Sequence, residues 1–181
     1  MALQGKKILL GVTGSIAAYK AAMLVRLLVK EGAEVQVVMT EGAHDFITPL
    51  TLSVLSKNPV QTKYFDGETG VWNNHVSLGI WADYFLIAPA TANTIAAMAN
   101  GSCNNLLQAV YLSARCPVGI ALAMDLDMYK HPAVQHNINT LASFGHDIFD
   151  AEEGELASGL EGKGRMMEPD NILKKLIVIL P

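Results

Sequence analysis

Short apolar runs alternate with amphipathic stretches along most of the chain. The apolar runs of strand length are residues 7–12, 33–40, 84–88 and 118–123. Between the first two, residues 16–30 place their apolar side chains on one helical face and stop before Gly32, a residue suited to a helix C-terminus. The alternation predicts strands that are connected by helices.

The same reading gives the rest of the expected elements. Further helices are expected over residues 46–55, 93–99, 104–113, 132–144 and 171–180, and a short edge strand over residues 147–149. Parallel strands need crossover connections, which are usually right-handed helices. The pattern therefore predicts a doubly wound three-layer α/β/α fold with a parallel sheet, Rossmann-like or flavodoxin-like, in which residues 1–181 form a single domain. Residues 151–165 lack any periodicity and are expected to be a loop, either a lid over a binding site or plain surface.

Composition narrows the class of protein. The 181 residues are 51% hydrophobic and 17% charged, as expected for one compact domain, and the net charge of −4 comes without a basic face for nucleic acid. The apolar runs are shorter than the roughly 20 residues of a membrane-spanning helix. Two cysteines are too few for a disulfide framework, and no signal-like segment opens the chain. We expect a soluble, cytoplasmic protein in which Cys103 and Cys116 are both buried.

Four loops that follow the expected strands carry small or hydroxyl-bearing residues, namely residues 11–16, 40–42, 89–94 and 121–125. Ligands of open α/β sheets bind beyond the carboxyl ends of the strands, where helix N-termini present free N–H groups. We expect a phosphate-sized polar rim here, with close backbone approach at Gly14 and Ser15, a hydroxyl at Thr40, and donors at Thr91, Asn93 and Thr94. The alternative is that Ser15, Thr40 and Asn93 only cap helices.

Neither common nucleotide fingerprint is present, since Gly11-x-x-Gly14 is not G-x-G-x-x-G and no G-x-x-x-x-G-K-[ST] occurs. This favours a mononucleotide ligand over a dinucleotide or a nucleoside triphosphate. No metal site is expected, because the other histidines form no metal-like group and are interpreted as surface or capping residues: His44, His131, His136 and His146.

Several separate segments together resemble one family. They are residues 14–20, 74–76, 89–94, 123–129 and 159–166, and in order and spacing they resemble the flavin-containing cysteine decarboxylases, most closely the branch that acts on 4'-phosphopantothenoylcysteine in coenzyme A biosynthesis. The resemblance covers essentially the whole chain.

The resemblance implies an FMN enzyme that forms homotrimers or assemblies of trimers, with flavin and substrate held at subunit contacts. It assigns the FMN contacts to Gly14, Ser15, Ile16, Thr40, Thr91, Ala92, Asn93, Thr94 and Ala123. These are the loops that the sheet argument selects independently. It also implies that the chain is the flavin domain of a larger protein that contains a synthetase domain.

The implied reaction begins with oxidation of the cysteine side chain by FMN, followed by loss of carbon dioxide to give an enethiolate. Return of the hydride and a proton would give 4'-phosphopantetheine. The family's histidine falls on His75, which would act as the acid-base group because imidazole titrates near neutral pH. The alternative is a structural histidine that caps the following helical turn.

The chain departs from the family pattern at the substrate motif, which is usually Pro-Ala-Met-Asn-x-x-Met-Trp. Here Asp125 replaces the asparagine, while Met128 keeps the second methionine, and both are expected to contact substrate. An ionised carboxylate only accepts hydrogen bonds and would repel the substrate carboxylate. Asp125 would have to be protonated, bind a different group, or help to expel the carboxylate; we favour the first and the third. Alternatively, Asp125 is an N-cap that never meets substrate.

A second departure lies at Ser158, where the coenzyme A branch has a cysteine that protonates the enethiolate. A hydroxyl is a far weaker acid than a thiol, so another acid would have to substitute or the reaction would stop at the enethiol. Three alternatives stay open: a peptidyl-cysteine decarboxylase, a flavin prenyltransferase, which the lack of a basic cluster disfavours, and a non-catalytic regulatory flavoprotein. Lys163 and Arg165, nearby, are interpreted as solvated loop charges rather than phosphate ligands.

Overall fold

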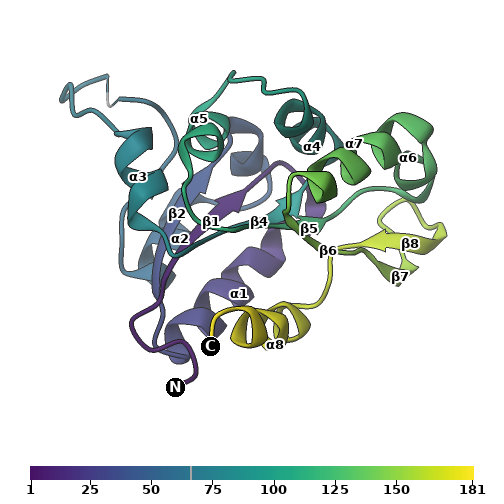
Figure 1. The fold of residues 1–181 in the computed structure, drawn as a ribbon, viewed down its shortest axis with the longest axis horizontal. Coiled ribbons are helices and arrows are strands. Elements are labelled where there is room, and N and C mark those ends of the chain that lie inside the picture. Colours follow the sequence, from purple (N-terminus) through teal and green to yellow (C-terminus); the bar gives the residue numbers. More distant parts are fainter. Residues whose placement is uncertain (66) are drawn as a thin grey trace.

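The computed structural model, which describes residues 1–65 and 67–181, has a six-stranded sheet at its centre (Figure 1). Its strands are β1 (Lys7–Val12), β2 (Glu34–Met39), β3 (Val60–Gln61), β4 (Tyr84–Ala90), β5 (Val118–Leu122) and β6 (Asp147–Phe149). They lie in the order β3-β2-β1-β4-β5-β6, and every neighbouring pair is parallel. The predicted doubly wound α/β fold is confirmed. The strand order reverses between β1 and β4, which makes their carboxyl ends the switch point where such sheets bind ligands.

Helices cover both faces of the sheet (Figure 1). They are α1 (Tyr19–Lys30), α2 (Pro49–Ser56), α3 (His75–Trp81), α4 (Ala92–Ala99), α5 (Leu106–Ser113), α6 (Leu126–Lys130), α7 (Pro132–Ser143) and α8 (Pro169–Ile179), with two 3₁₀ turns, η1 (Ile16–Ala18) and η2 (Glu41–Asp45). Helices α1, α2 and α8 contribute to one buried cluster and α3, α4, α5 and α7 to another. Strand β1 shows why the two clusters are separate, because Ile8 and Leu10 enter the first and Leu9 enters the second.

The stretch that lacks periodicity is not a plain loop. Residues 151–165 include an antiparallel hairpin of β7 (Glu152–Glu155) and β8 (Glu161–Arg165), which projects beside α6 (Figure 1). Both strands are rich in glycine and charge, and neither shows the alternation that predicts a strand. Gly154 and Gly162 have φ angles of 152° and 156°, which L side chains rarely adopt, so the hairpin depends on glycine at these positions.

Four other elements were not predicted: β3, η2, α3 and α6. Each has seven residues or fewer, too short to show a full hydrophobic period. Within the two described ranges, no helix is long and apolar enough to cross a membrane.

Candidate functional site

A cavity of about 570 Å³ opens where β1, β2, β4 and β5 end, and we call it the strand-end cavity. Its walls include most of the rim predicted from the sequence: Gly14, Ser15, Thr40, Gly42, Thr91, Ala92, Asn93, Thr94 and Ala123, together with Asn104, Asn105 and Met128. The four predicted loops therefore meet at one site. Its volume lies in the range of small-molecule pockets.

The β1 and β2 loops approach each other closely at Gly14. A Cβ atom at this position would lie 2.8 Å from the carbonyl oxygen of Gly42, so only glycine fits without movement of the backbone. The Ser15 side chain accepts a hydrogen bond of 3.2 Å from the N–H of Ala17 and so caps η1. For Ser15, the alternative of a capping role is confirmed. Ile16 lines the neighbouring cavity rather than this one.

Sequence reasoning missed Thr13, which links the ends of β1 and β4. Its side chain is buried, donates a 2.7 Å hydrogen bond to the carbonyl oxygen of Pro89, and accepts one of 3.3 Å from the N–H of Thr91. The sequence does contain a signal for this role, because Thr13 places a hydroxyl directly after the apolar run of residues 7–12. Thr13 holds two walls of the strand-end cavity in register.

The start of α4 forms another wall. Thr91 is its N-cap and accepts a 3.3 Å hydrogen bond from the N–H of Thr94. Asn93 is exposed, lies inside the helix and caps nothing, while Thr40 occupies the N-cap position of η2 without making a capping bond. The capping alternative is therefore wrong for Thr40 and Asn93, whose side chains remain available to a ligand. An eight-residue helix start beside free hydroxyl and amide groups suits a phosphate.

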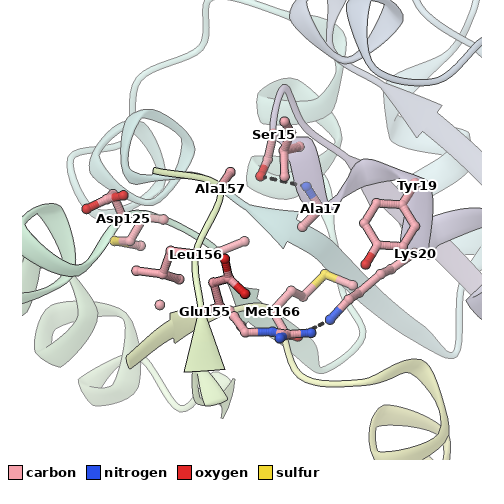
Figure 2. Close-up of a pocket in the computed structure, with 14 residues that line it drawn as sticks. Ser15, Ala17, Tyr19, Lys20, Asp125, Glu155, Leu156, Ala157 and Met166 are labelled. Carbon is pink, nitrogen blue, oxygen red and sulfur yellow. Dashed lines mark hydrogen bonds between the residues drawn. The ribbon is translucent and has the colours of Figure 1, made fainter. Parts of the chain in front are cut away.

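A second cavity, of about 440 Å³, adjoins the first, and we call it the hairpin cavity (Figure 2). It lies between η1 and α1 on one side and the β7–β8 hairpin on the other. Ser15, Ala123 and Met124 line both cavities. A ligand in one cavity could therefore contact a ligand in the other.

Lys20 is the buried cation of the hairpin cavity, only 3% exposed. Its ammonium donates to the carbonyl oxygen of Met166 at 2.8 Å and to a carboxylate oxygen of Glu168 at 2.7 Å. Arg165 also lines the cavity and reaches the same Glu168 oxygen at 3.3 Å. Arg165 is therefore ion-paired as well as partly solvated, with a side chain that is 40% exposed.

Lys163 is likewise paired rather than free. It forms an ion pair with Asp150 and lies 5.3 Å from the centre of the Tyr129 ring, while the Tyr129 hydroxyl donates to Asp150 at 2.6 Å. Burial acts to raise the pKa of Asp150, but the bonds from Lys163 and Tyr129 outweigh it and lower that pKa below its ordinary value. This cluster ties the hairpin to α6.

Asp125 lines the hairpin cavity and occupies the N-cap position of α6, but its side chain makes no capping bond. Its loop is fixed by a 3.0 Å hydrogen bond from the N–H of Met124 to the carbonyl oxygen of Gly164. A Cβ at Gly164 would clash with the Met124 carbonyl oxygen, so glycine allows the hairpin to pack on this loop. Met128, the other expected substrate contact, lines the strand-end cavity instead.

His75 lies in neither cavity of this chain. It is the first residue of α3, and its ring packs edge-on against Tyr64 and Trp72, at 6.1 and 6.4 Å between ring centroids. Its Nδ1 atom is buried and has no hydrogen-bond partner among the described residues. The cap of α3 is Asn74, which accepts from the N–H groups of Val76 and Ser77, so the capping role considered for His75 is wrong.

Ser158 also lies outside both cavities. It is exposed in the turn of the β7–β8 hairpin, and its hydroxyl accepts a 3.4 Å hydrogen bond from the N–H of Leu160. Its neighbour Ala157 does line the hairpin cavity. The turn must therefore move before the Ser158 hydroxyl can reach a ligand held in either cavity.

The remaining histidines differ from one another. His131 caps α7, as expected, and accepts from the N–H of Ala133 at 3.2 Å, and His136 is exposed. The interpretation of His44 as a surface or capping residue is wrong, since its Nε2 is buried without a partner among the described residues. The ring of His146 is hydrogen-bonded to the Tyr111 hydroxyl at 2.8 Å.

No metal-like cluster of histidine, cysteine or acidic residues occurs within residues 1–65 and 67–181. Cys103 is exposed and Cys116 is partly buried, so the prediction that both are buried is wrong.

Comparison with known proteins identifies similar chains. A family model described as Flavoprotein matches residues 1–180. A relative described as Cysteine/Cysteine sulfinic acid decarboxylase, from an unknown prokaryotic organism, is 60% identical over 72% of this chain and 36% of its own length. The Coenzyme A biosynthesis bifunctional protein CoaBC of Vibrio vulnificus (strain YJ016) is 49% identical over 92% of this chain and 42% of its own length. The chain thus spans less than half of the length of each of these relatives.

Two solved structures share the fold over nearly the full chain. One is a PPC decarboxylase variant complexed with pantothenoylaminoethenethiol, with a TM-score of 0.86, 30% identity, and coverage of 97% of this chain and 98% of the other. The other is the FMN-dependent cysteine decarboxylase SpaF, with a TM-score of 0.81, 29% identity, and coverage of 99% of each chain.

Proposed function

The chain belongs to the flavoprotein family, and we propose that it binds FMN and decarboxylates the cysteine carboxylate of 4'-phosphopantothenoylcysteine. The observation that carries this proposal is the pair of adjoining cavities. The strand-end cavity is lined mainly by small, hydroxyl and amide residues, with Glu41 as its one acidic side chain. The hairpin cavity combines apolar walls with two cationic and two acidic side chains. The names of the similar proteins support the same reaction class.

The strand-end cavity offers hydrogen-bond donors that suit the phosphate of FMN. Thr40 and Asn93 offer side chains that make no capping bond, and the α4 N-terminus offers N–H groups. Gly14 allows the backbone to approach closely, because no Cβ would fit beside Gly42. Bound FMN would supply the two-electron oxidation that makes the cysteine carboxylate a good leaving group.

The hairpin cavity is the proposed substrate site. Ser15, Ala123 and Met124 form the boundary with the strand-end cavity, so substrate held by the hairpin would meet the cofactor there. Arg165 and Lys20, both paired with Glu168, supply positive charge to an anionic substrate, and Asp125 and Glu155 supply negative charge. Leu156 and Met166 add apolar walls.

We also propose that His75 acts in the site of a neighbouring subunit within a homotrimer or an assembly of trimers. Around it, exposed apolar side chains gather on α3, α5 and the segment before α3: Val71, Trp72, Val76, Ile80 and Leu112. Helix α3 contacts α5, so the exposed side chains of the two helices lie on neighbouring elements. An exposed patch of this kind often marks an interface.

Subunit complementation tests the placement of His75. His75→Ala and Asp125→Ala variants are each expected to be inactive, whereas a mixed assembly that is unfolded and refolded together contains sites with both native residues. Recovery of activity in the mixture supports a shared site. No recovery, in mixed assemblies shown to form by mass, would place both residues in one subunit.

A second candidate function ends at the oxidised enethiol, because Ser158 lies outside the hairpin cavity and is a weak acid. In that case the product is two hydrogens lighter than 4'-phosphopantetheine, and FMN stays reduced until reoxidised. Mass analysis separates the two products. A Ser158→Cys variant is expected to shift the mixture toward the reduced product, with Ser158→Ala as its control.

The deciding experiment is a visible spectrum of the purified protein, followed by incubation with 4'-phosphopantothenoylcysteine and analysis of the products. Flavin absorbance together with release of carbon dioxide is expected. Failure to take up FMN would refute the proposed FMN-dependent decarboxylase activity. The chain would then be a flavin-free protein of the same fold.

We further propose that residues 1–181 are the flavin domain of a longer cytoplasmic protein that carries a synthetase domain. The support is the similarity to CoaBC, of whose length this chain spans 42%.

A further inference from the structure

We propose that Glu155 is the general acid that protonates the enethiolate carbon after carbon dioxide has left, in place of the cysteine whose position Ser158 occupies. This inference rests on the decarboxylase activity proposed above and adds a catalytic residue to it. It also selects between the two candidate functions, because an enzyme that has its own acid completes the reaction to 4'-phosphopantetheine.

Glu155 is the acidic group that the β7–β8 hairpin itself contributes to the hairpin cavity. It is the last residue of β7, three positions before Ser158, and it lines the cavity, whereas Ser158 does not. Figure 2 shows the Glu155 carboxylate between the side chains of Asp125 and Lys20. The turn would have to move before Ser158 could donate a proton to a ligand, but Glu155 already lies in the wall.

No cation holds the Glu155 carboxylate in its ionised form. Lys20 and Arg165, the two cations of the cavity, both pair with Glu168 instead. Among the described residues, Glu155 takes part in no ion pair. A cation close to a carboxylate favours its ionised form, so an unpaired carboxylate takes up a proton more readily. Glu155 is therefore able to gain and lose a proton during a reaction.

The charges around the cavity favour a proton on Glu155 when substrate is bound. Three carboxylates, those of Glu155, Asp125 and Glu168, lie in the cavity wall or against its two cations. Glu161 adds another, since it is the partner of Glu155 in the β7–β8 register. A substrate carboxylate brings a further negative charge into the same space. Because like charges at short range favour the protonated form of a carboxyl group, substrate binding should load Glu155 with the proton that the reaction needs.

The other proton donors of the cavity suit this step less well. Asp125 is half-buried at the start of α6, whereas Glu155 is exposed and can regain a proton from water after each turnover. Tyr19 also lines the cavity, but a phenol is a much weaker acid than a carboxyl group. A carboxyl group is also a stronger acid than the thiol that the coenzyme A branch uses. Glu155 thus combines acid strength with access to water.

The proton balance of the reaction requires one acid of this kind. In the oxidation, a hydride leaves Cβ of the cysteine for the flavin, and the thiol proton passes to His75, the proposed base. When the Cα–carboxyl bond breaks, its electron pair forms the Cα=Cβ bond of the enethiolate. The O–H bond of Glu155 then breaks and its proton forms a Cα–H bond, which leaves a thioaldehyde that takes the hydride back at Cβ. The resulting thiolate recovers the proton from His75, so each turnover consumes one proton from water through Glu155.

The test measures carbon dioxide and the masses of the products that the FMN-loaded protein forms from 4'-phosphopantothenoylcysteine. In the wild type we expect mainly 4'-phosphopantetheine. In Glu155→Gln the ratio of enethiol to 4'-phosphopantetheine should rise at least tenfold, while carbon dioxide release in the first turnover persists, because decarboxylation precedes the proton transfer. Glu155→Asp keeps a carboxyl group and should restore part of the reduced product. The matched control is Glu153→Gln, which makes the same change at an exposed residue of β7 outside the cavity and should keep the wild-type ratio.

Calorimetry supplies a second measurement that needs no turnover. The FMN-loaded protein is titrated with pantothenoylserine, which keeps the carboxylate, has a hydroxyl in place of the thiol, and lacks a phosphate that could titrate. Titrations in two buffers of different ionisation enthalpy give the number of protons taken up on binding. We expect proton uptake by the wild type and by Glu153→Gln, and less uptake by Glu155→Gln.

Four outcomes would contradict these expectations. An unchanged product ratio in Glu155→Gln, or proton uptake equal to that of the wild type, overturns the role of Glu155. A product ratio that shifts in Asp125→Asn but not in Glu155→Gln assigns the acid to Asp125 instead. A wild type that releases carbon dioxide but forms only the enethiol overturns the inference and supports the second candidate function. Absence of carbon dioxide from the FMN-loaded wild type overturns the proposed function itself.

Discussion

The hydroxyl of Thr13 donates a 2.7 Å hydrogen bond to the carbonyl oxygen of Pro89, a residue 76 positions further along the chain. The same oxygen atom of Thr13 accepts from the N–H of Thr91. One buried side chain thus holds the end of β1 against the end of β4, at the point where the strand order of the sheet reverses. The two loops that would enclose the FMN phosphate are positioned by this contact.

Replacing Thr13 with valine keeps the shape of the side chain and removes the hydroxyl. Two backbone groups then lose their partner, at a cost of about 1–3 kcal/mol in the free energy of unfolding. We expect FMN affinity, measured by quenching of flavin fluorescence, to fall by tenfold or more. Thr13→Ser retains the hydroxyl and should keep most of the affinity; a larger loss in Thr13→Ser than in Thr13→Val would show that the methyl group, rather than the hydroxyl, matters.

Gly14→Ala tests the close approach between the β1 and β2 loops. The added Cβ would lie 2.8 Å from the Gly42 carbonyl oxygen, so the loop must move and the strand-end cavity must change shape. We expect FMN affinity to fall at least tenfold. The control is Gly67→Ala, whose Cβ would meet no atom within 4 Å and which lines neither cavity; flavin titration should find it close to wild type. Similar affinities for the two variants would contradict this account.

The Lys20–Glu168 pair can be dissected with a double-mutant cycle. Lys20→Met removes the buried cation and keeps an apolar side chain. We expect it to lower the free energy of unfolding by about 1–3 kcal/mol. Glu168→Leu leaves the buried ammonium without its carboxylate. We expect this change to lower the free energy of unfolding by about 3 kcal/mol, the lower end of the range for broken buried ion pairs. The lower end applies because the Glu168 side chain is 43% exposed. Urea unfolding should show that the double variant is more stable than Glu168→Leu alone; strict additivity would argue against coupling.

His146 should give stability a pH dependence. Burial lowers its pKa below the ordinary value, while the charge of Asp147 acts in the opposite direction. The unfolded chain therefore binds a proton at a pH where the folded chain does not, so stability falls as the pH drops below about 6.5, by at most about 1.4 kcal/mol per pH unit.

Urea unfolding of His146→Gln between about pH 7.5 and about pH 5.5 should show a shallower loss of stability than the wild type. The exposed His136 supplies the matched control, since His136→Gln should keep the wild-type slope. An unchanged slope in His146→Gln would rule out His146 as the source.

The elements that could be predicted from the sequence are those with enough residues to show a period. Strand β1 and helices α1 and α7 appear close to their expected positions, because continuous apolar runs and one-sided apolar faces have few alternative structures. The β7–β8 hairpin could not be predicted. Its strands are held by pairing with each other and by the contact of Gly164 with the Met124 loop, which no local pattern reveals.

The sequence by itself determined that this is a doubly wound α/β protein with small and hydroxyl residues after its strands, since hydrophobic period and turn residues are local properties. Only the tertiary structure decided which of those residues share a cavity. It joined Thr13 to Pro89 and Lys20 to Glu168, left Asp125 unpaired in a cavity wall, and kept His75 and Ser158 outside both cavities. The physical reason is that hydrogen bonds and ion pairs between residues far apart in the chain depend on how the loops pack, and packing is a property of the whole fold.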